Sequence, residues 1–197
     1  MFKRLISAMA IGASLIASGA AAEPIHINTL SNYLNRISSA TSGFTQINSN
    51  GSVDKGNLYM QKPYRMRFEY STQNVLVLAS GGQVAIFEDK GNAQQYPMSK
   101  TPLSLILAPH VDIQKQGAVV AHGEMNGNTI VTVKDPSGQT PGSIEMLFSP
   151  GPELRQWVVT DESGQRTTVI LDGLRSGVEF RPSTFSIHNE VDRRRSR

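Results

Sequence analysis

The stretch "YRMRFEY" at residues 64–70 alternates between apolar and charged side chains, which is the period of an extended strand. One side of such a strand carries Tyr64, Met66, Phe68 and Tyr70. The charged residues between them must face the other way, because burying an arginine or a glutamate without a partner costs several kcal/mol. The stretch therefore predicts a sheet with one apolar face and one face in water.

The same two-residue period recurs along most of the chain. Strands are predicted at "FTQIN" (44–48), "GNLYMQ" (56–61), "NVLVLAS" (74–80), "TIVTVK" (129–134), "SIEMLF" (143–148), "RQWVVTD" (155–161) and "RTTVIL" (166–171). Turn sequences rich in Gly, Asn, Asp and Ser separate many of them, such as "NGN" at 126–128. Strands at this spacing pair with their sequence neighbours, so we expect an antiparallel meander.

Two segments with a different period could cover the apolar face. Apolar residues recur at intervals of three and four from residue 27, which predicts an amphipathic helix over residues 27–41 that ends at Gly43. The stretch "TPLSLILAPH" at 101–110 predicts a short, very apolar helix near residues 103–108. Together these helices span about 35 Å, at ~1.5 Å per residue, which is too little to seal a curved sheet of roughly ten strands. A trough with a helical lid is therefore expected.

The lining of that trough is predicted from the apolar side of the strands and from the lid. Its residues are rich in Met and Phe, which repack readily: Leu58, Met60, Met66, Phe68, Leu105, Ile106, Met146 and Phe148. Taken singly, each is more simply explained as ordinary core. The hypothesis of an apolar ligand therefore depends on the two helices being too short to cover the apolar face of the sheet, and not on any one residue.

The beginning of the chain and its lack of cysteine indicate export. Lys3 and Arg4 precede an apolar run and small residues up to Ala22, so residues 1–22 are assigned to a cleaved signal peptide. The chain has no cysteine, which excludes disulfides, thiolate metal sites and a lipid-anchored cysteine. An exported chain of this kind is expected in the periplasm.

The basic residues are concentrated at the ends of the chain. Of 19 lysines and arginines, two precede residue 23 and four follow residue 192, which leaves 13 basic and 16 acidic residues between them. Residues 23–192, assigned to one domain, thus carry a charge of about −3 and offer no field for nucleic acid. The remaining "RRRSR" at 193–197 is expected to be a disordered, solvated tail.

Catalytic and metal-binding motifs do not emerge from the sequence. The four histidines are scattered, without a His-x-x-x-His pair, and there is no Gly-x-Ser-x-Gly elbow. His110, Asp112 and His122 could supply three metal ligands, but their spacing matches no familiar site and a solvated loop explains them better. We expect no enzymatic activity, no metal and no cofactor.

Five stretches, taken in order, carry a pattern that runs over nearly all of the chain after residue 22. They are "FTQ" (44–46), "GNLYMQKPYRMRFEY" (56–70), "SGGQVAIF" (80–87), "TPLSLIL" (101–107) and "LRQWVVTDESGQRTTVIL" (154–171). This pattern resembles the outer-membrane lipoprotein carrier protein LolA family. The resemblance implies a mainly β fold with an α lid, in which a single curved antiparallel sheet forms an open half-barrel covered by short helices.

The resemblance also implies a function and partners. Such proteins are periplasmic chaperones that take acylated lipoproteins from an inner-membrane ABC transporter and pass them to an acceptor in the outer membrane. By position, Lys62 stands where familiar members have an arginine that bonds to the lid, so it is expected to act as the lid latch. Met66 and Phe68 match positions that line the acyl cavity. The alternative is a periplasmic sensor or carrier domain of the same fold for another lipid or amphiphile, and in either case a monomer is expected.

Overall fold

The computed structural model describes residues 23–88, 93–115 and 117–196. The predicted signal peptide, residues 1–22, lies outside the described residues.

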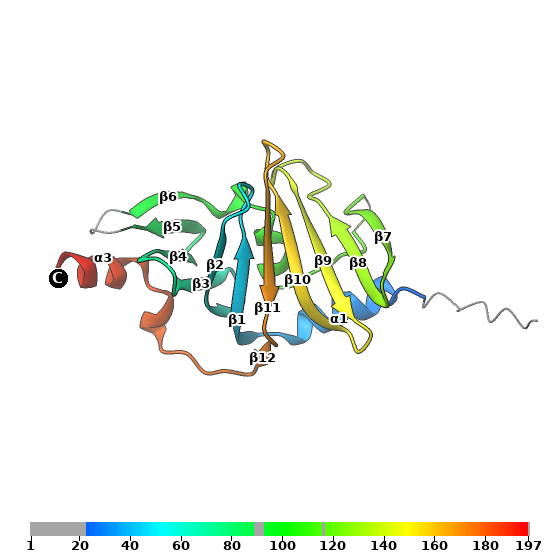
Figure 1. Ribbon diagram of the computed structural model, residues 1–197, viewed down its shortest axis with the longest axis horizontal. Coiled ribbons are helices and arrows are strands. Elements are labelled where there is room, and N and C mark those ends of the chain that lie inside the picture. Colours follow the sequence, from blue (N-terminus) through cyan, green and yellow to red (C-terminus); the bar gives the residue numbers. More distant parts are fainter. Residues whose placement is uncertain (1–22, 89–92, 116, 197) are drawn as a thin grey trace, which may run out of the picture.

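Twelve strands in the described part of the chain form one antiparallel sheet (Figure 1). The strands are β1 Ser39–Ile47, β2 Val53–Gln61, β3 Arg65–Tyr70, β4 Leu76–Ser80, β5 Gln83–Phe87, β6 Ala93–Pro97, β7 Val119–Met125, β8 Asn128–Val133, β9 Ser143–Ser149, β10 Glu153–Thr160, β11 Arg166–Leu171 and β12 Arg175–Ser176. Their order is β6-β5-β4-β3-β2-β1-β11-β10-β9-β8-β7, and β12 pairs with β1. The expected mainly β architecture with neighbouring antiparallel strands is confirmed.

Strand β1 joins two meanders into this sheet. On one side it pairs with β2 over its whole length, from Ser39 opposite Gln61 to Ile47 opposite Val53. On the other side its second half pairs with β11, with Phe44 opposite Leu171. Because β1 and β11 are far apart in sequence, this pairing closes the first meander onto the second and extends one continuous apolar face across both.

That apolar face, called the inner face here, carries the main core. Alternate residues of the central strands are buried on it, including Leu58 and Met60 of β2, Met66 and Phe68 of β3, and Met146 and Phe148 of β9. The Phe68 ring meets Phe44 edge to face at 5.3 Å between ring centroids, and Trp157 in the same manner at 6.5 Å. The two-residue period of the sequence thus predicts correctly which side chains point inward.

Helices lie on both faces of the sheet. They are α1 Ile27–Arg36, α2 Leu103–Leu107 and α3 Ile187–Arg195, with short 3-10 turns η1 Met98–Lys100 and η2 Pro182–Phe185. Leu30 and Leu34 of α1, and Ile106 and Leu107 of α2, are buried in the inner core. These two helices cover the inner face, whereas α3 lies beside β4 (Figure 1).

The first helix is shorter than the sequence indicates. The prediction placed a helix over 27–41, but α1 ends at Arg36 and the chain is extended from Ser39. Residues Ser39 to Gly43 pair with β2, and Ala40 and Thr41 also pair with β12. Two partner strands satisfy the backbone better than another helical turn of Ser, Thr and Gly, all weak helix formers.

The opposite, outer face is not entirely in water, which corrects the prediction of one wet face. The C-terminal arm, residues 174–196, crosses the outer side of β3, β4 and β5 (Figure 1). There it builds a second cluster, the outer cluster, from Leu76, Leu78, Ala85, Phe87 and Phe185. Phe180 packs edge to face on Phe185 at 5.3 Å and on Tyr59 at 6.1 Å. The arm therefore buries the outward-facing apolar residues of these strands.

The expected disordered tail at 193–197 is also wrong for residues 193–196. Arg193, Arg194 and Arg195 belong to α3, whose N-cap Ser186 accepts a hydrogen bond from the backbone N–H of Asn189. The carboxylate of Glu190, which is 5% exposed, forms ion pairs with the guanidinium groups of Arg193 at 2.5 Å and Arg194 at 2.8 Å. Arg194 also stacks over the ring of Phe87 at 5.3 Å. These contacts anchor the end of the arm to the outer cluster.

Glu190 also links the arm to strand β3. The guanidinium of Arg67 on β3 lies 3.6 Å from its carboxylate. Burial alone would raise the pKa of Glu190, but hydrogen bonds and charge from Arg193 and Arg194, with the charge of Arg67, hold it below its usual value. The carboxylate is therefore ionised at neutral pH and balances several cations.

The substitution Glu190→Gln should lower the free energy of unfolding by about 2–3 kcal/mol, because it leaves Arg194, which is 9% exposed, without a counter-charge and removes one of the two carboxylates beside Arg67. Urea unfolding at neutral pH measures the change. The matched control is Asp192→Asn on the same helix, at a carboxylate that is 58% exposed and should change stability by less than about 0.5 kcal/mol. Equal effects of the two substitutions would contradict this role of Glu190.

Candidate functional site

The inner face is closed by a lid that consists of α1, α2 and residues 108–113. The lid contributes Leu30, Leu34, Ile106, Leu107, Val111 and Ile113 to the inner core. Leu103 and Leu105 of α2 are partly buried against the same core. Apolar contacts of this kind are not directional, so an apolar guest could replace them.

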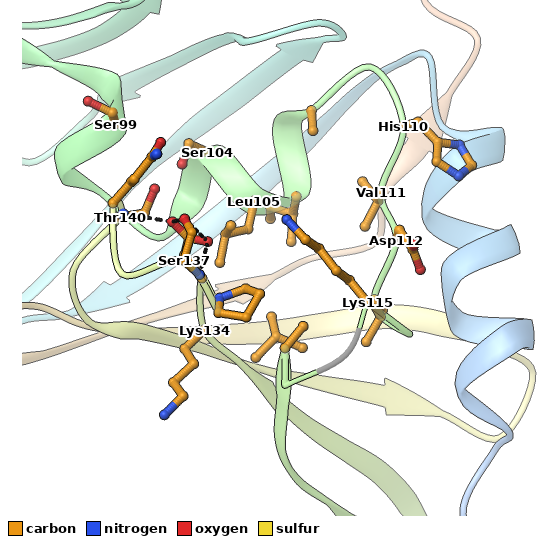
Figure 2. A pocket seen from close by; sticks show the side chains of 18 of the residues that line it. Ser99, Ser104, Leu105, His110, Val111, Asp112, Lys115, Lys134, Ser137 and Thr140 are labelled. Atoms are coloured by element: carbon orange, nitrogen blue, oxygen red, sulfur yellow. Dashed lines mark hydrogen bonds between the residues drawn. The ribbon is translucent and has the colours of Figure 1, made fainter.

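A cavity of about 540 Å³ remains between the lid and the sheet, beside α2 (Figure 2). Its wall includes Leu105 and Ile106 from the lid and Val133 and Met146 from strands β8 and β9. The polar rim comes from η1, from α2 and from the loop between β8 and β9: Ser99, Ser104, Lys134, Asp135, Ser137, Gln139 and Thr140. An apolar interior with a polar mouth is the usual form of a site for an amphiphilic ligand.

The predicted lining residues are divided among three places. Leu105, Ile106 and Met146 line this cavity. Met66 and Phe68 line a separate space of about 60 Å³ under α2, together with Leu103 and Leu107. Leu58, Met60 and Phe148 are buried in the inner core and line neither space. In this closed arrangement the lid itself occupies much of the trough that the sequence suggested.

Several wall residues were not among those predicted. Val111, Ile113 and Ala118 follow α2 and complete the apolar wall of the cavity. The alternation in "HVDI" at 110–113 was a signal that could have identified Val111 and Ile113. Tyr64 was expected to face the core from a strand, but it lies in the turn before β3, with φ 55° and 39% exposure, and lines the cavity mouth.

The turn at residues 62–64 bonds to both lid helices. The ammonium of Lys62 donates to the carbonyl oxygen of Leu34 in α1 at 2.8 Å. The backbone N–H of Tyr64 donates to the carbonyl oxygen of Leu107 in α2 at 2.9 Å. Both acceptors belong to the last turns of their helices, where carbonyls lack the usual partner four residues on, and the carbonyl of Leu34 also accepts from the capping N–H of Ile37 at 3.3 Å. Lys62 thus has the contact of a lid latch in the described structure.

Two further side chains hold α1 in place. Asn35 exchanges hydrogen bonds with the backbone of Val111, donating from Nδ2 at 2.9 Å and accepting at Oδ1 at 2.8 Å. The hydroxyl oxygen of Tyr33 accepts from the backbone N–H of Leu154 on β10 at 3.1 Å, and burial raises the pKa of this phenol. Asn35 therefore ties the two parts of the lid together, and Tyr33 ties the lid to the sheet.

The side chains considered for a metal site do not converge. His110 lines the cavity, whereas the Nε2 atom of His122 lies 3.0 Å from the carbonyl oxygen of Ile25. Within residues 23–88, 93–115 and 117–196, no three His, Asp or Glu side chains form a metal-binding group. None of the helices in the same ranges is long and apolar enough to cross a bilayer.

Comparison with known proteins identifies the family. Residues 35–188 match the family model "Outer membrane lipoprotein carrier protein LolA". The match spans most of the chain, so the protein belongs to the LolA family. Proteins of this family are carriers and not enzymes, which confirms the prediction that the chain is not an enzyme.

The individual relatives are distant. An uncharacterized protein of Rickettsia prowazekii is 25% identical over 167 residues, which cover 84% of this chain and 78% of the relative. Among solved structures, a LolA superfamily protein of Nitrosomonas europaea has a TM-score of 0.41 at 7% identity, covering 83% of this chain and 99% of its own. A putative outer membrane lipoprotein-sorting protein domain of Vibrio parahaemolyticus has a TM-score of 0.47 at 8% identity, with coverages of 84% and 96%.

The latch at Lys62 should make stability depend on alkaline pH. Burial lowers the pKa of Lys62 from 10.5 to about 8 in the folded chain. The unfolded chain therefore binds more protons between these two pH values, so the contribution of Lys62 to the free energy of unfolding rises as pH increases from about 8 to 10.5. Urea unfolding of the wild type and of Lys62→Met at pH 7, 9 and 10 should show their difference shifting in favour of the wild type.

The control for this pH series is Lys55→Met, at an exposed lysine on strand β2, which precedes the turn that carries Lys62. Its difference from the wild type should stay constant over the same range. If the profiles of the wild type and Lys62→Met run parallel, Lys62 is not buried in the way its contact with Leu34 indicates.

Proposed function

We propose that the mature chain is a periplasmic chaperone that binds the acyl chains of lipoproteins released from the inner membrane and carries them to the outer membrane. Its partners in this role are acylated lipoproteins, an inner-membrane lipoprotein-releasing ABC transporter and an acceptor at the outer membrane. Membership of the LolA family supports the class of cargo. The observation that carries the proposal is an apolar sheet face whose cover is a lid of short helices joined to it by exchangeable contacts.

A carrier is needed because of the size of the apolar cargo. A triacylated lipoprotein has on the order of 45 methylenes, and each costs about 0.8 kcal/mol in water, or roughly 35 kcal/mol in total. Free diffusion through an aqueous compartment is negligible against such a cost. An apolar face that is shielded when empty and available when loaded removes most of it.

The lid has to move for this cargo to bind. Taking roughly 30 Å³ for each methylene, about the volume of a water molecule in the liquid, the cavity of about 540 Å³ holds about 18 methylenes. That is fewer than half of the chain length to be carried. The remainder has to take the place of lid residues such as Ile106 and Leu107, which are buried on the sheet in the described structure.

The closed lid also explains how cargo could be released. Binding competes with the contacts of the lid on the empty sheet. The apparent affinity is therefore the intrinsic affinity of the open state multiplied by the fraction of molecules that are open. A pocket that was fully formed and permanently open would hold the acyl chains too tightly to pass them on. Lys62, Tyr64 and Tyr33 each contribute a hydrogen bond to the competing closed state.

A disulfide between the lid and the sheet should abolish most binding. Cysteines introduced as Tyr64→Cys and Ala108→Cys flank the 2.9 Å hydrogen bond from Tyr64 to Leu107, and the natural chain has no cysteine to interfere. Binding of a fluorescent triacylated lipopeptide should be at least roughly tenfold weaker in the oxidised form than after reduction, because the open state is removed. Each single-cysteine variant should bind equally with and without oxidant. Unchanged binding by the oxidised protein would refute lid movement.

Cargo can be identified directly from cells. The exported chain, purified from the periplasm, should carry acylated lipoproteins detectable by mass spectrometry. Leu105→Asp places a charge in the cavity wall and should remove most of this material. Val120→Asp, at an exposed residue of β7 outside the cavity, is the matched control and should retain it. Recovery of a different amphiphile in place of lipoproteins would favour a carrier or sensor for that lipid.

A further inference from the structure

One cation projects into the cavity and is not explained by binding of neutral acyl chains. Lys115 lines the cavity after the lid segment, and Figure 2 shows its side chain reaching across toward α2. Lys134 also belongs to the lining, but in the same view its side chain points away from α2. Of the two lysines, only Lys115 is therefore oriented to contact a ligand in the cavity.

The ammonium of Lys115 has no counter-charge nearby. Residues 23–88, 93–115 and 117–196 give it no carboxylate within the 4 Å of an ion pair. The carboxylate of Asp135, on the opposite rim, accepts instead from the hydroxyl of Ser137 at 2.7 Å and from the backbone N–H of Thr140 at 2.9 Å. The carboxylate of Asp112 accepts from the backbone N–H of Gln114 at 3.0 Å.

We propose that the closed protein binds a second kind of ligand in this cavity: a single-chain amphiphile with an anionic head, which pairs with Lys115. The chain lies against Leu105, Ile106 and Met146, and the carboxylate or phosphate head accepts from the Lys115 ammonium at the mouth. This ligand differs from the lipoprotein cargo, whose acyl chains bring no anionic group to the site, and it does not require the lid to open.

Size and charge both favour this occupant. Room for about 18 methylenes, at roughly 30 Å³ each, accommodates one fatty-acyl chain and its head but not two chains. Charge-assisted hydrogen bonds are about twice as strong as neutral ones. Lys115 is exposed, so its bond to an anionic head is made at the mouth of the cavity and not in the apolar interior. An amphiphile with the same chain and a neutral head makes the apolar contacts but not the charge-assisted bond.

Calorimetric titration of the purified chain with decanoate, decyl phosphate and decan-1-ol, below their aggregation concentrations, tests the proposal. The wild type should bind at least one of the two anions roughly tenfold more tightly than the alcohol. The variant Lys115→Gln should bind that anion and the alcohol equally. Lys134→Gln, the matched control at the lysine that points away, should keep the preference of the wild type.

The two anions distinguish a carboxylate site from a phosphate site, and tight binding of either supports the proposal. Equal binding of anion and alcohol by the wild type would overturn the proposal. An equal loss of the preference in the Lys115→Gln and Lys134→Gln variants would also overturn it, because that result indicates only a general positive field. Binding of the alcohol alone would leave the carrier function intact and reject the head-group site. Failure of all three probes would also reject the cavity as an acyl-chain site.

Discussion

The structure depends on one constraint, which is that a single sheet cannot hide its own apolar face. In the described residues the inner face of the sheet runs from β6 to β7, and its cover consists of α1, α2 and residues 108–113. The buried residues of the core and the candidate binding surface are therefore the same side chains. In most globular proteins the core is closed permanently, whereas here part of it is closed by short elements that pack through few contacts.

The strength of that closure is limited by the small number of its polar contacts. The lid is held on the sheet and its turn by Lys62 on Leu34, by Tyr64 on Leu107 and by Tyr33 on Leu154, and a hydrogen bond adds about 1 kcal/mol net. The apolar contacts of α2 contribute more, but a bound acyl chain supplies equivalent contacts. The balance between a closed and a loaded protein is thus set by side chains that cargo can replace. The turn at 62–64 contacts both helices of the lid.

Much of this could be predicted from the sequence, because alternation fixes which face of a strand is buried. Met66, Phe68, Met146 and Phe148 are all buried on the inner face as expected. What the local pattern could not show is pairing over long distance. The extended chain at Ser39 depends on β2 and β12, and the order of the last arginines depends on contacts such as that of Arg194 with the ring of Phe87. Yet a signal was present in α3, since Glu190 stands three and four residues before Arg193 and Arg194.

The division of the predicted lining residues has the same cause. Sequence assigns a residue to a face, but it does not say how much of that face the lid occupies. Leu58, Met60 and Phe148 point inward and yet line no cavity, since the lid and neighbouring core residues fill the space around them. Lys115 was overlooked for a related reason, because a lone lysine in a loop is ordinary until the fold places it at the mouth of an apolar cavity.

The two faces of β3 contact different parts of the chain. Inward, Met66 and Phe68 lie under helix α2, which the proposed function requires to move. Outward, Arg67 between them donates to the carbonyl oxygen of Thr184 at 3.3 Å and lies 3.6 Å from Glu190, both in the C-terminal arm. Aromatic contacts of Phe180 and Phe185 reinforce the same attachment. A lid can leave one side of a strand without disturbing the sheet only if the other side is fixed, and the arm supplies that fixed side.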